Sequence, residues 1–169
     1  MARAHGFTLV EMLVVVVIVG VLAGAVGLAG GARGGAYPLR EEAERLARVV
    51  RLVADEAVLD NREYGLVIDA GGYQVRRHDA HSGRWQPVPD WQPHRLPDGM
   101  QLSLAVEGSE LGLPAQALGR ERPPQLLLSS AAQWTPFSAR LHGRRDDGPV
   151  YHVQSDGLND PQVSGVGLP

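Results

Sequence analysis

A carboxylate placed directly ahead of an apolar run constrains this chain more than any other feature. Glu11 ends the segment Gly-Phe-Thr-Leu-Val-Glu at residues 6–11, and residues 12–32 carry no charge. About 20 apolar residues is the length that an α-helix needs to cross a bilayer. A charged side chain at the centre of such a helix costs about 2.5–3.5 kcal/mol. We therefore expect a membrane anchor in which the glutamate has a function.

Two other interpretations fit an N-terminal apolar run. A secretory signal peptide would have an apolar core of about 7–15 residues and a small-residue cleavage site, for which Ala-Gly-Ala at residues 23–25 is a candidate. The charge of Glu11 and the length of the run disfavour it. A plain single-pass anchor, in which Glu11 is incidental, is the second alternative.

The segment at residues 6–11 resembles the class III signal of type IV pilins and type II secretion pseudopilins. In that class a prepilin peptidase cuts after the glycine and N-methylates the new first residue. The resemblance implies cleavage between Gly6 and Phe7, methylation of Phe7, and Glu11 as the acid typical of the class. It covers only the first fifth of the chain.

These features predict three parts: a leader at residues 1–6, a transmembrane and assembly segment at residues 7–32, and a periplasmic domain at residues 33–169. Arg3 is the basic residue ahead of the span, and positive charge favours the cytoplasmic side. We expect a single-pass inner-membrane protein with its N-terminus in the cytoplasm. Gly20 and Gly24 form a small-xxx-small pair, which indicates either helix contacts or simply the abundance of glycine in membrane helices.

Apolar residues recur at alternating four- and three-residue steps from residue 38 onward, which predicts an amphipathic helix lying on a sheet. Glu41 with Arg45, and Glu44 with Arg48, have the i,i+4 spacing of ion pairs on its exposed side. The predicted buried stripe consists of Leu39, Ala43, Leu46, Val50, Val53 and Ala57.

Alternating apolar residues and turn signals predict an antiparallel β-structure after this helix. Residues 63–69, with Tyr64, Leu66 and Ile68 on one face, form a hairpin with residues 73–78 across Gly71 and Gly72. The prolines around residues 84–88 place that strand at an edge. Residues 107–124 are predicted as a polar loop, and residues 156–169 as a tail without periodicity. Further strands are predicted at residues 100–106, 125–129, 137–141 and 150–154.

The body of the chain resembles the H-type minor pseudopilins of type II secretion, the GspH family. The segments that carry this resemblance are less specific than residues 6–11. It implies an α+β, pilin-like fold in which a long N-terminal helix lies on antiparallel β-sheets that form a small β-sandwich. The matching segments are LARVVRL at residues 46–52, YGL at 64–66, LPDG at 96–99, LLLSS at 126–130 and TPF at 135–137.

Candidate chemical groups outside the N-terminal motif are better explained structurally. His78, Asp79 and His81 lack a further ligand at a metal-site spacing, so we expect a solvated turn. Ser129 and Ser130 lack the glycine-flanked elbow and the paired histidine and aspartate of a nucleophile. We predict no catalytic residue, no cofactor and no metal.

Charge gives little support for nucleic-acid binding. The net charge is −3, and Asp146 and Asp147 directly follow Arg144 and Arg145, so we expect a solvated turn there. The three tryptophans, Trp85, Trp91 and Trp134, are expected to fill core or loop positions.

Together these observations predict a non-enzymatic minor pseudopilin of a type II secretion system. Its expected partners are the prepilin peptidase, the other minor pseudopilins, the major pseudopilin and inner-membrane lipid, with no nucleic acid. The alternative is a DNA-binding minor pilin of a type IV pilus, similar to FimT-type proteins. Residues 156–169 contain no arginine, which disfavours that alternative. An enzyme with a membrane anchor is the third interpretation.

Overall fold

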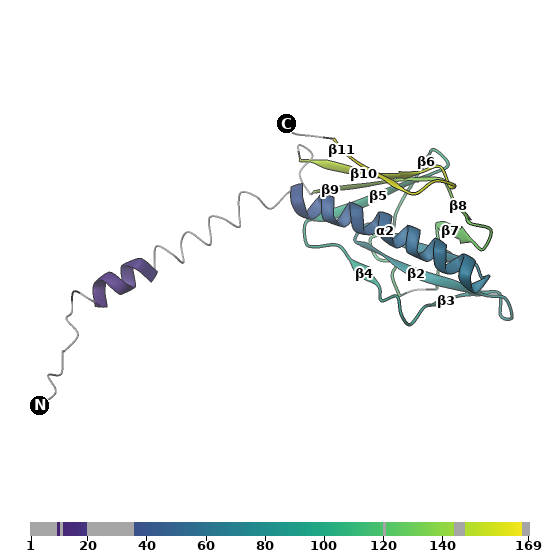
Figure 1. Ribbon diagram of the computed structural model, residues 1–169, viewed down its shortest axis with the longest axis horizontal. Coiled ribbons are helices and arrows are strands. Elements are labelled where there is room, and N and C mark those ends of the chain that lie inside the picture. The colour runs from purple at the N-terminus through teal and green to yellow at the C-terminus, as the bar shows by residue number, and fades with distance from the viewer. Residues whose placement is uncertain (1–9, 11, 20–35, 120, 144–147, 167–169) are drawn as a thin grey trace, which may run out of the picture. The chain divides into compact units, whose positions relative to one another are not determined.

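The computed structural model describes residues 10, 12–19, 36–119, 121–143 and 148–166. The chain divides into two units, Met1–Gly35 and Ala36–Pro169, and each is described by itself. Helix α2 and all strands shown in Figure 1 belong to the second unit.

In the first unit, residues 12–19 are helical and their apolar side chains are exposed. The predicted cleavage residues Gly6 and Phe7, the acid Glu11 and the glycines Gly20 and Gly24 lie outside the described residues. Among the residues that are described, no helix is both long enough and apolar enough to cross a membrane.

The second unit begins with helix α2, Ala36–Asp60. Pro38 lies in its first turn, where backbone N–H groups have no partner within the helix. The six residues of the predicted stripe, from Leu39 to Ala57, are each at most 2% exposed. The prediction of an amphipathic helix with this buried face is confirmed.

Asn61 ends α2 with a left-handed residue, at φ 51°. The Asn61 N–H donates to the Val58 carbonyl at 3.2 Å, and the Arg62 N–H donates to the Ala57 carbonyl at 3.0 Å. These two bonds form a Schellman motif, which pairs carbonyls that a helix terminus leaves free. The chain therefore turns directly into the first strand.

The exposed side of α2 carries one of the two predicted ion pairs. Glu44 forms the predicted ion pair with Arg48, at 3.9 Å, and also accepts a hydrogen bond from Arg40 at 2.8 Å. The pairing of Glu41 with Arg45 was wrong, because Arg45 makes no ion pair with any described residue.

The first sheet has six strands in the order β3-β2-β1-β7-β8, with β4 also paired to β2. The predicted hairpin of β1 with β2 is confirmed, with Leu66 opposite Val75. The strand that carries Pro87 lies at an edge, as predicted. The bounds are β1 Tyr64–Asp69, β2 Gly72–Asp79, β3 Arg84–Pro87, β4 His94–Arg95, β7 Leu126–Ser129 and β8 Gln133–Trp134.

The second sheet has five strands in the order β11-β10-β9-β5-β6. The predicted pair at residues 137–141 and 150–154 is confirmed, with Leu141 opposite Tyr151. The bounds are β5 Met100–Val106, β6 Ser109–Leu111, β9 Phe137–Gly143, β10 Val150–Ser155 and β11 Gln162–Val166.

The prediction that residues 156–169 lack regular structure was wrong, because β11 pairs with β10 there. This edge strand shows no clear alternation, since nearly all of its side chains are exposed. Asp156 organises the turn before it by accepting the backbone N–H groups of Asn159 and Leu158. Those hydrogen bonds, with that from the Asn159 side chain, lower the pKa of Asp156 to about 2.

Helix α2 contacts strands of both sheets, including β1 and β7 of the first and β9, β10 and β11 of the second. Figure 1 shows the second sheet above α2 and strands β2, β3 and β4 below it. Leu66, Leu104, Leu141 and Val153 join the α2 stripe in one core. The arrangement is the predicted helix on antiparallel sheets.

Strand β1 is buried on both faces, whereas the alternation predicted only Tyr64, Leu66 and Ile68 as buried. The described residues of the loop at 112–119 and 121–125 lie against β1 and the turn after it, through Pro114, Pro124 and Gln125. A Cβ at Gly65 would lie 2.5 Å from Pro124 Cγ, so glycine permits this close approach. On the neighbouring strand β2, Gln74 and Arg76 are buried as well.

We predict that Val50→Asp destabilises the second unit by several kcal/mol, because it places an unpaired carboxylate in the core between the sheets. Urea unfolding of the full chain in detergent, followed by tryptophan fluorescence, measures the effect. Leu52→Asp is the matched control, since Leu52 lies on the same helix but is 55% exposed. Equal midpoints for the two variants would contradict the assigned helix face.

Candidate functional site

The residues with a predicted role in processing and assembly, Gly6, Phe7 and Glu11, lie outside the described residues, as do Arg144 and Arg145. The candidate groups of the second unit are all placed except for this pair. Their geometry shows whether the folded unit carries chemistry of its own.

The turn at residues 78–82 is held by Asp79. Its carboxylate accepts the His81 backbone N–H at 3.0 Å, the Ser82 hydroxyl at 2.9 Å and the Gln86 amide at 2.9 Å. The bonds from the His81 backbone and the Ser82 hydroxyl lower the pKa of Asp79. In the described part of the chain, no three metal-ligating side chains gather at one place.

The serines singled out in the sequence stabilise another turn. The Ser130 backbone N–H and hydroxyl both donate to Glu63, at 3.3 and 3.2 Å, and the Ser129 hydroxyl accepts the Ala131 N–H at 3.1 Å. These contacts fix the connection after β7.

Each tryptophan contacts a side chain of another part of the folded unit. Trp91 donates its indole N–H to Glu56 of α2 at 2.8 Å. Trp134 donates to the Ser155 hydroxyl at 2.7 Å. The Trp85 and His78 rings are tilted by 55° against each other, with centroids 5.1 Å apart.

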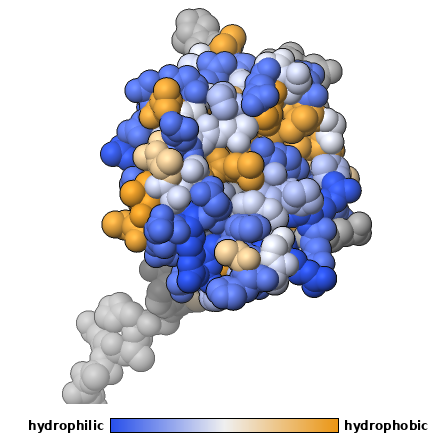
Figure 2. Space-filling model, turned by 90° about the vertical axis from the view of Figure 1, so that its right-hand side faces the viewer, coloured by the Kyte–Doolittle hydropathy of each residue, from blue (hydrophilic) through white to orange (hydrophobic). Residues whose placement is uncertain are grey.

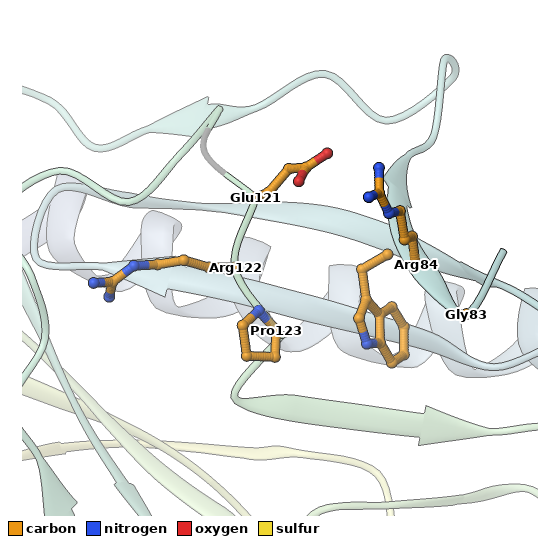
Figure 3. Close-up of a pocket in the computed structure, with 6 residues that line it drawn as sticks. Gly83, Arg84, Glu121, Arg122 and Pro123 are labelled. Carbon is orange, nitrogen blue, oxygen red and sulfur yellow. The ribbon is translucent and has the colours of Figure 1, made fainter.

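A shallow cleft of about 180 Å³ lies between β3 and the residues before β7. It is below the roughly 300–1,000 Å³ of typical small-molecule sites. Figure 3 shows Arg84 and Arg122 pointing in different directions, so their guanidinium groups do not converge on one anion. Arg84, Trp85, Glu121, Arg122 and Pro123 line the cleft.

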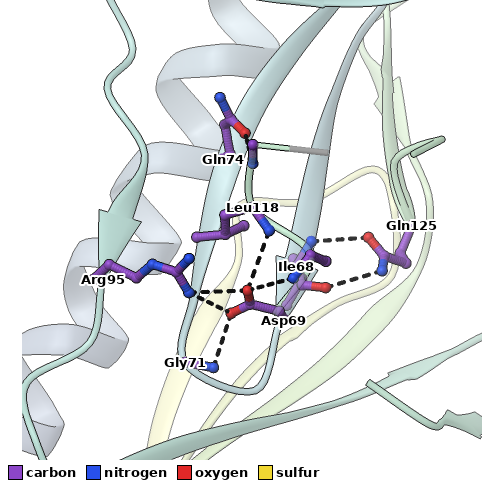
Figure 4. A network of polar contacts seen from close by, with 9 residues as sticks. Ile68, Asp69, Gly71, Gln74, Arg95, Leu118 and Gln125 are labelled. Carbon is purple, nitrogen blue, oxygen red and sulfur yellow. Dashed lines mark hydrogen bonds and ion pairs between the residues drawn. The ribbon is translucent and has the colours of Figure 1, made fainter. Parts of the chain in front are cut away.

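The most highly connected polar group in the fold is Asp69, at the end of β1. Its carboxylate is fully buried and pairs with Arg95 at 3.0 Å. It also accepts the backbone N–H groups of Gly71 at 2.9 Å, Ala117 at 2.9 Å and Leu118 at 3.3 Å. Figure 4 shows these contacts converging from the β1–β2 turn, β4 and the loop at residues 112–125.

Two glutamines complete the attachment of this loop. Gln125 donates to the Ile68 carbonyl at 3.0 Å and accepts the Ile68 N–H at 2.9 Å (Figure 4). Gln74 accepts the Gly119 N–H at 3.0 Å. The prediction of a polar loop at residues 107–124 was wrong for Ser109–Leu111, which form β6 and pair with β5. The later part of that segment is bonded to the first sheet through Ala117, Leu118 and Gly119.

Sequence reasoning missed Asp69, because its partners lie up to 49 positions away. The sequence does offer one indication. Asp69 follows a run of apolar residues at the end of a predicted strand, and Gly71 and Gly72 come shortly after it. Figure 2 shows polar residues surrounding several separate apolar clusters on one face of the folded unit.

Residues 1–27 match the family described as "Prokaryotic N-terminal methylation motif". Over 168 residues the chain is 40% identical to the type II secretion system protein H of Pseudomonas aeruginosa, which covers 96% of this chain and 97% of that protein. The chain belongs to the type II secretion system protein H family. The protein H of Aeromonas hydrophila is 30% identical over 86% of this chain and 84% of its own.

Solved structures of family members show the same fold. The minor pseudopilin EpsH from the type 2 secretion system of Vibrio cholerae aligns with a TM-score of 0.59 at 21% identity, over 75% of this chain and 94% of that one. The solution structure of Escherichia coli GspH aligns with a TM-score of 0.52 at 14% identity, over 79% and 94%. The resemblance to the GspH family is confirmed, and the secretion interpretation is favoured over the DNA-binding pilin.

We predict that Asp69→Ala destabilises the second unit by about 1–3 kcal/mol, because it leaves buried backbone N–H donors without their acceptor. Arg95 is half exposed, so water replaces its partner. Hydrogen exchange should speed up most at the Ala117 and Leu118 amides. Asp79→Ala, which removes a carboxylate whose side chain is 33% exposed, is the control and should change the unfolding midpoint far less. Unchanged exchange at Ala117 and Leu118 would show that Asp69 does not hold the loop.

Proposed function

We propose that this chain is a minor structural subunit of the type II secretion pseudopilus and has no catalytic role of its own. One observation carries the proposal. The similarity to protein H extends over 96% of the chain, so it includes both the N-terminal motif and the folded unit. The role is to enter a short periplasmic filament that supports protein secretion across the outer membrane.

The proposed division of the chain follows the order of assembly. Residues 1–6 are the leader, residues 7–32 the membrane and assembly segment, and residues 33–169 the periplasmic domain. A prepilin peptidase cuts between Gly6 and Phe7 and methylates Phe7. The match of residues 1–27 to the methylation motif supports this processing.

The proposed partners are the prepilin peptidase, the other minor pseudopilins and the major pseudopilin, together with inner-membrane lipid before assembly. The chain crosses the inner membrane once, with its N-terminus in the cytoplasm and its folded unit in the periplasm. Nucleic acid is not a partner, in keeping with the net charge of −3.

Glu11 supplies the electrostatic part of assembly in this proposal. Cleavage creates a positive amine on Phe7, and Glu11 of a neighbouring subunit neutralises it among packed helices. Opposite charges attract strongly in a low-dielectric medium, and an unpaired buried charge is costly. The ion pair therefore favours the incorporation of subunits that have been cleaved and that lie next to a neighbour in the correct position.

Processing gives a direct test. Mass spectrometry of the protein extracted from membranes should show a chain that begins at methylated Phe7. Gly6→Ala should leave most of the chain uncut, because a methyl group is added at the scissile position. An intact Met1 in the wild-type protein, or a cut near Ala25, would refute the proposed cleavage.

Glu11→Ala separates processing from assembly. The variant should still be cut after Gly6, because the peptidase acts on the bond beside the glycine. It should co-purify poorly with the other pilin-like subunits, because the Phe7 amine then lacks its partner. Glu11→Asp should be intermediate, since it keeps the charge with a shorter reach.

The readouts are co-purification of the processed variants and a secretion assay in a strain that lacks this gene. Wild-type secretion and co-purification by Glu11→Ala would refute the electrostatic role and leave the motif as a sorting signal. The proposal also excludes a Glu11→Ala variant that co-purifies normally but fails to restore secretion. In that case the defect would lie after entry into the filament.

A further inference from the structure

Strand β11 forms one edge of the second sheet. It pairs antiparallel with β10, from Gln162 opposite Gln154 to Val166 opposite Val150, and in the described part of the chain no strand lies on its other side. Figure 1 shows β11 beyond β10, at the outside of the sheet. The backbone N–H and C=O groups on the outer side of such a strand can pair with another extended chain.

The other sheet edges of the described chain carry features that hinder such pairing. Strand β3 contains Arg84 and Pro87, and charges and prolines are what proteins place at edges for this purpose. Strand β6 has only three residues and includes Glu110, while β4 and β8 have two residues each. Strand β11 has five residues with neither a charge nor a proline. It is therefore the edge best suited to accept another strand.

The core-facing side of this edge is incompletely covered. Val163 and Tyr151 pack against the core but are only partly buried. The Tyr151 ring lies against Gly165, because a Cβ at this glycine would be 2.8 Å from Tyr151 Cε1. Apolar residues from beyond β11 would cover Val163 and Tyr151, and the burial of apolar surface favours association.

The solvent-facing side chains of β11 are neutral. They belong to Gln162, Ser164 and Val166, of which Val166 is 64% exposed. The nearest preceding acid, Asp160, is already paired with Arg51 of α2 at 2.7 Å. The strand itself therefore selects for backbone and apolar contacts and not for a charge.

We propose that β11 is a docking edge for one extended segment of another protein, which joins the second sheet beside β11. The backbone of this segment pairs with the free side of β11, as in other cases of β-strand addition. Side chains alternate along a strand, so apolar residues at every second position of the segment lie over Val163 and Tyr151. The proposal holds whether or not the chain enters a filament.

A second copy of this chain fits the edge less well. Antiparallel pairing of two β11 strands about Ser164 would place Gly165 of one copy opposite Val163 of the other. The glycine brings no side chain over Val163 or Tyr151, so their apolar surface would stay open. The segment therefore comes from a different protein and carries an apolar residue where β11 has Gly165.

Designed peptides added to the full chain in detergent test the backbone pairing. The probe is acetylated, amidated Lys-Thr-Val-Thr-Val-Thr-Lys. One control carries N-methyl groups on both valines and the other on all three threonines. The valine N–H groups point to one edge of the extended peptide and the threonine N–H groups to the other. The probe and one control should bind. Binding by both controls, by neither control, or no binding by the probe would overturn the proposal.

Hydrogen exchange locates the bound peptide. The amides of residues 162–166 that point away from β10 should exchange about tenfold more slowly when about 90% of the chain is bound. The NMR signals of the Tyr151 ring should shift, because apolar side chains then lie beside it. Slowed exchange at β6, the opposite edge of the same sheet, with β11 unchanged would overturn the assignment.

A charge on the core-facing side of the edge should block docking. Val163→Lys should weaken binding of the probe by about tenfold, because docking would bury an unpaired ammonium group. Leu111→Lys, on the β6 edge, is the matched control and should bind normally. If Val163→Lys lowers the unfolding midpoint, Val163→Thr replaces it and should weaken binding several-fold. Wild-type binding by a folded Val163 variant would overturn the proposal.

A cysteine variant distinguishes a different partner from a second copy. The chain has no native cysteine, so Ser164→Cys carries a single thiol at the centre of β11. Under mild oxidation in detergent it should form disulfide-linked dimers no faster than Ser109→Cys, a control on the β6 edge. Faster dimer formation by Ser164→Cys would show that β11 receives a second copy and would overturn the assignment to another protein.

Discussion

The structure depends on the burial of one apolar stripe of α2 between two sheets. The stripe from Leu39 to Ala57 faces strands of both sheets, and α2 is the one helix among the described residues of the second unit. Full burial of each large apolar side chain contributes about 1.5–3 kcal/mol to the stability of the folded state. Both sheets therefore lose their core together when this helix face is disrupted.

Features with local causes could be predicted from the sequence. The stripe repeats with the period of a helix, and Gly71 with Gly72 marks the turn between two alternating strands, so α2 and the β1–β2 hairpin follow from neighbouring residues. Strand β11 could not be predicted, because an edge strand with mostly exposed side chains shows no alternation. Its pairing with β10 depends on tertiary position.

Long-range polar contacts could not be predicted from the sequence, for a different reason. Gln74 and Asp69 are polar residues in strand positions, and only the return of residues 112–125 shows why they are buried. The N-terminal motif needed no tertiary information, since it is one continuous run of six residues at positions 6–11.

The way in which residues 112–125 are attached has a consequence for how this protein changes over evolution. The loop is held mainly by its own backbone N–H groups, at Ala117, Leu118 and Gly119, which bond to side chains of the first sheet. Substituting side chains on the loop leaves those bonds intact. Orthologues should therefore vary freely at loop positions such as Gln116 while retaining Asp69. The loop sequence can then change while its backbone keeps the same path.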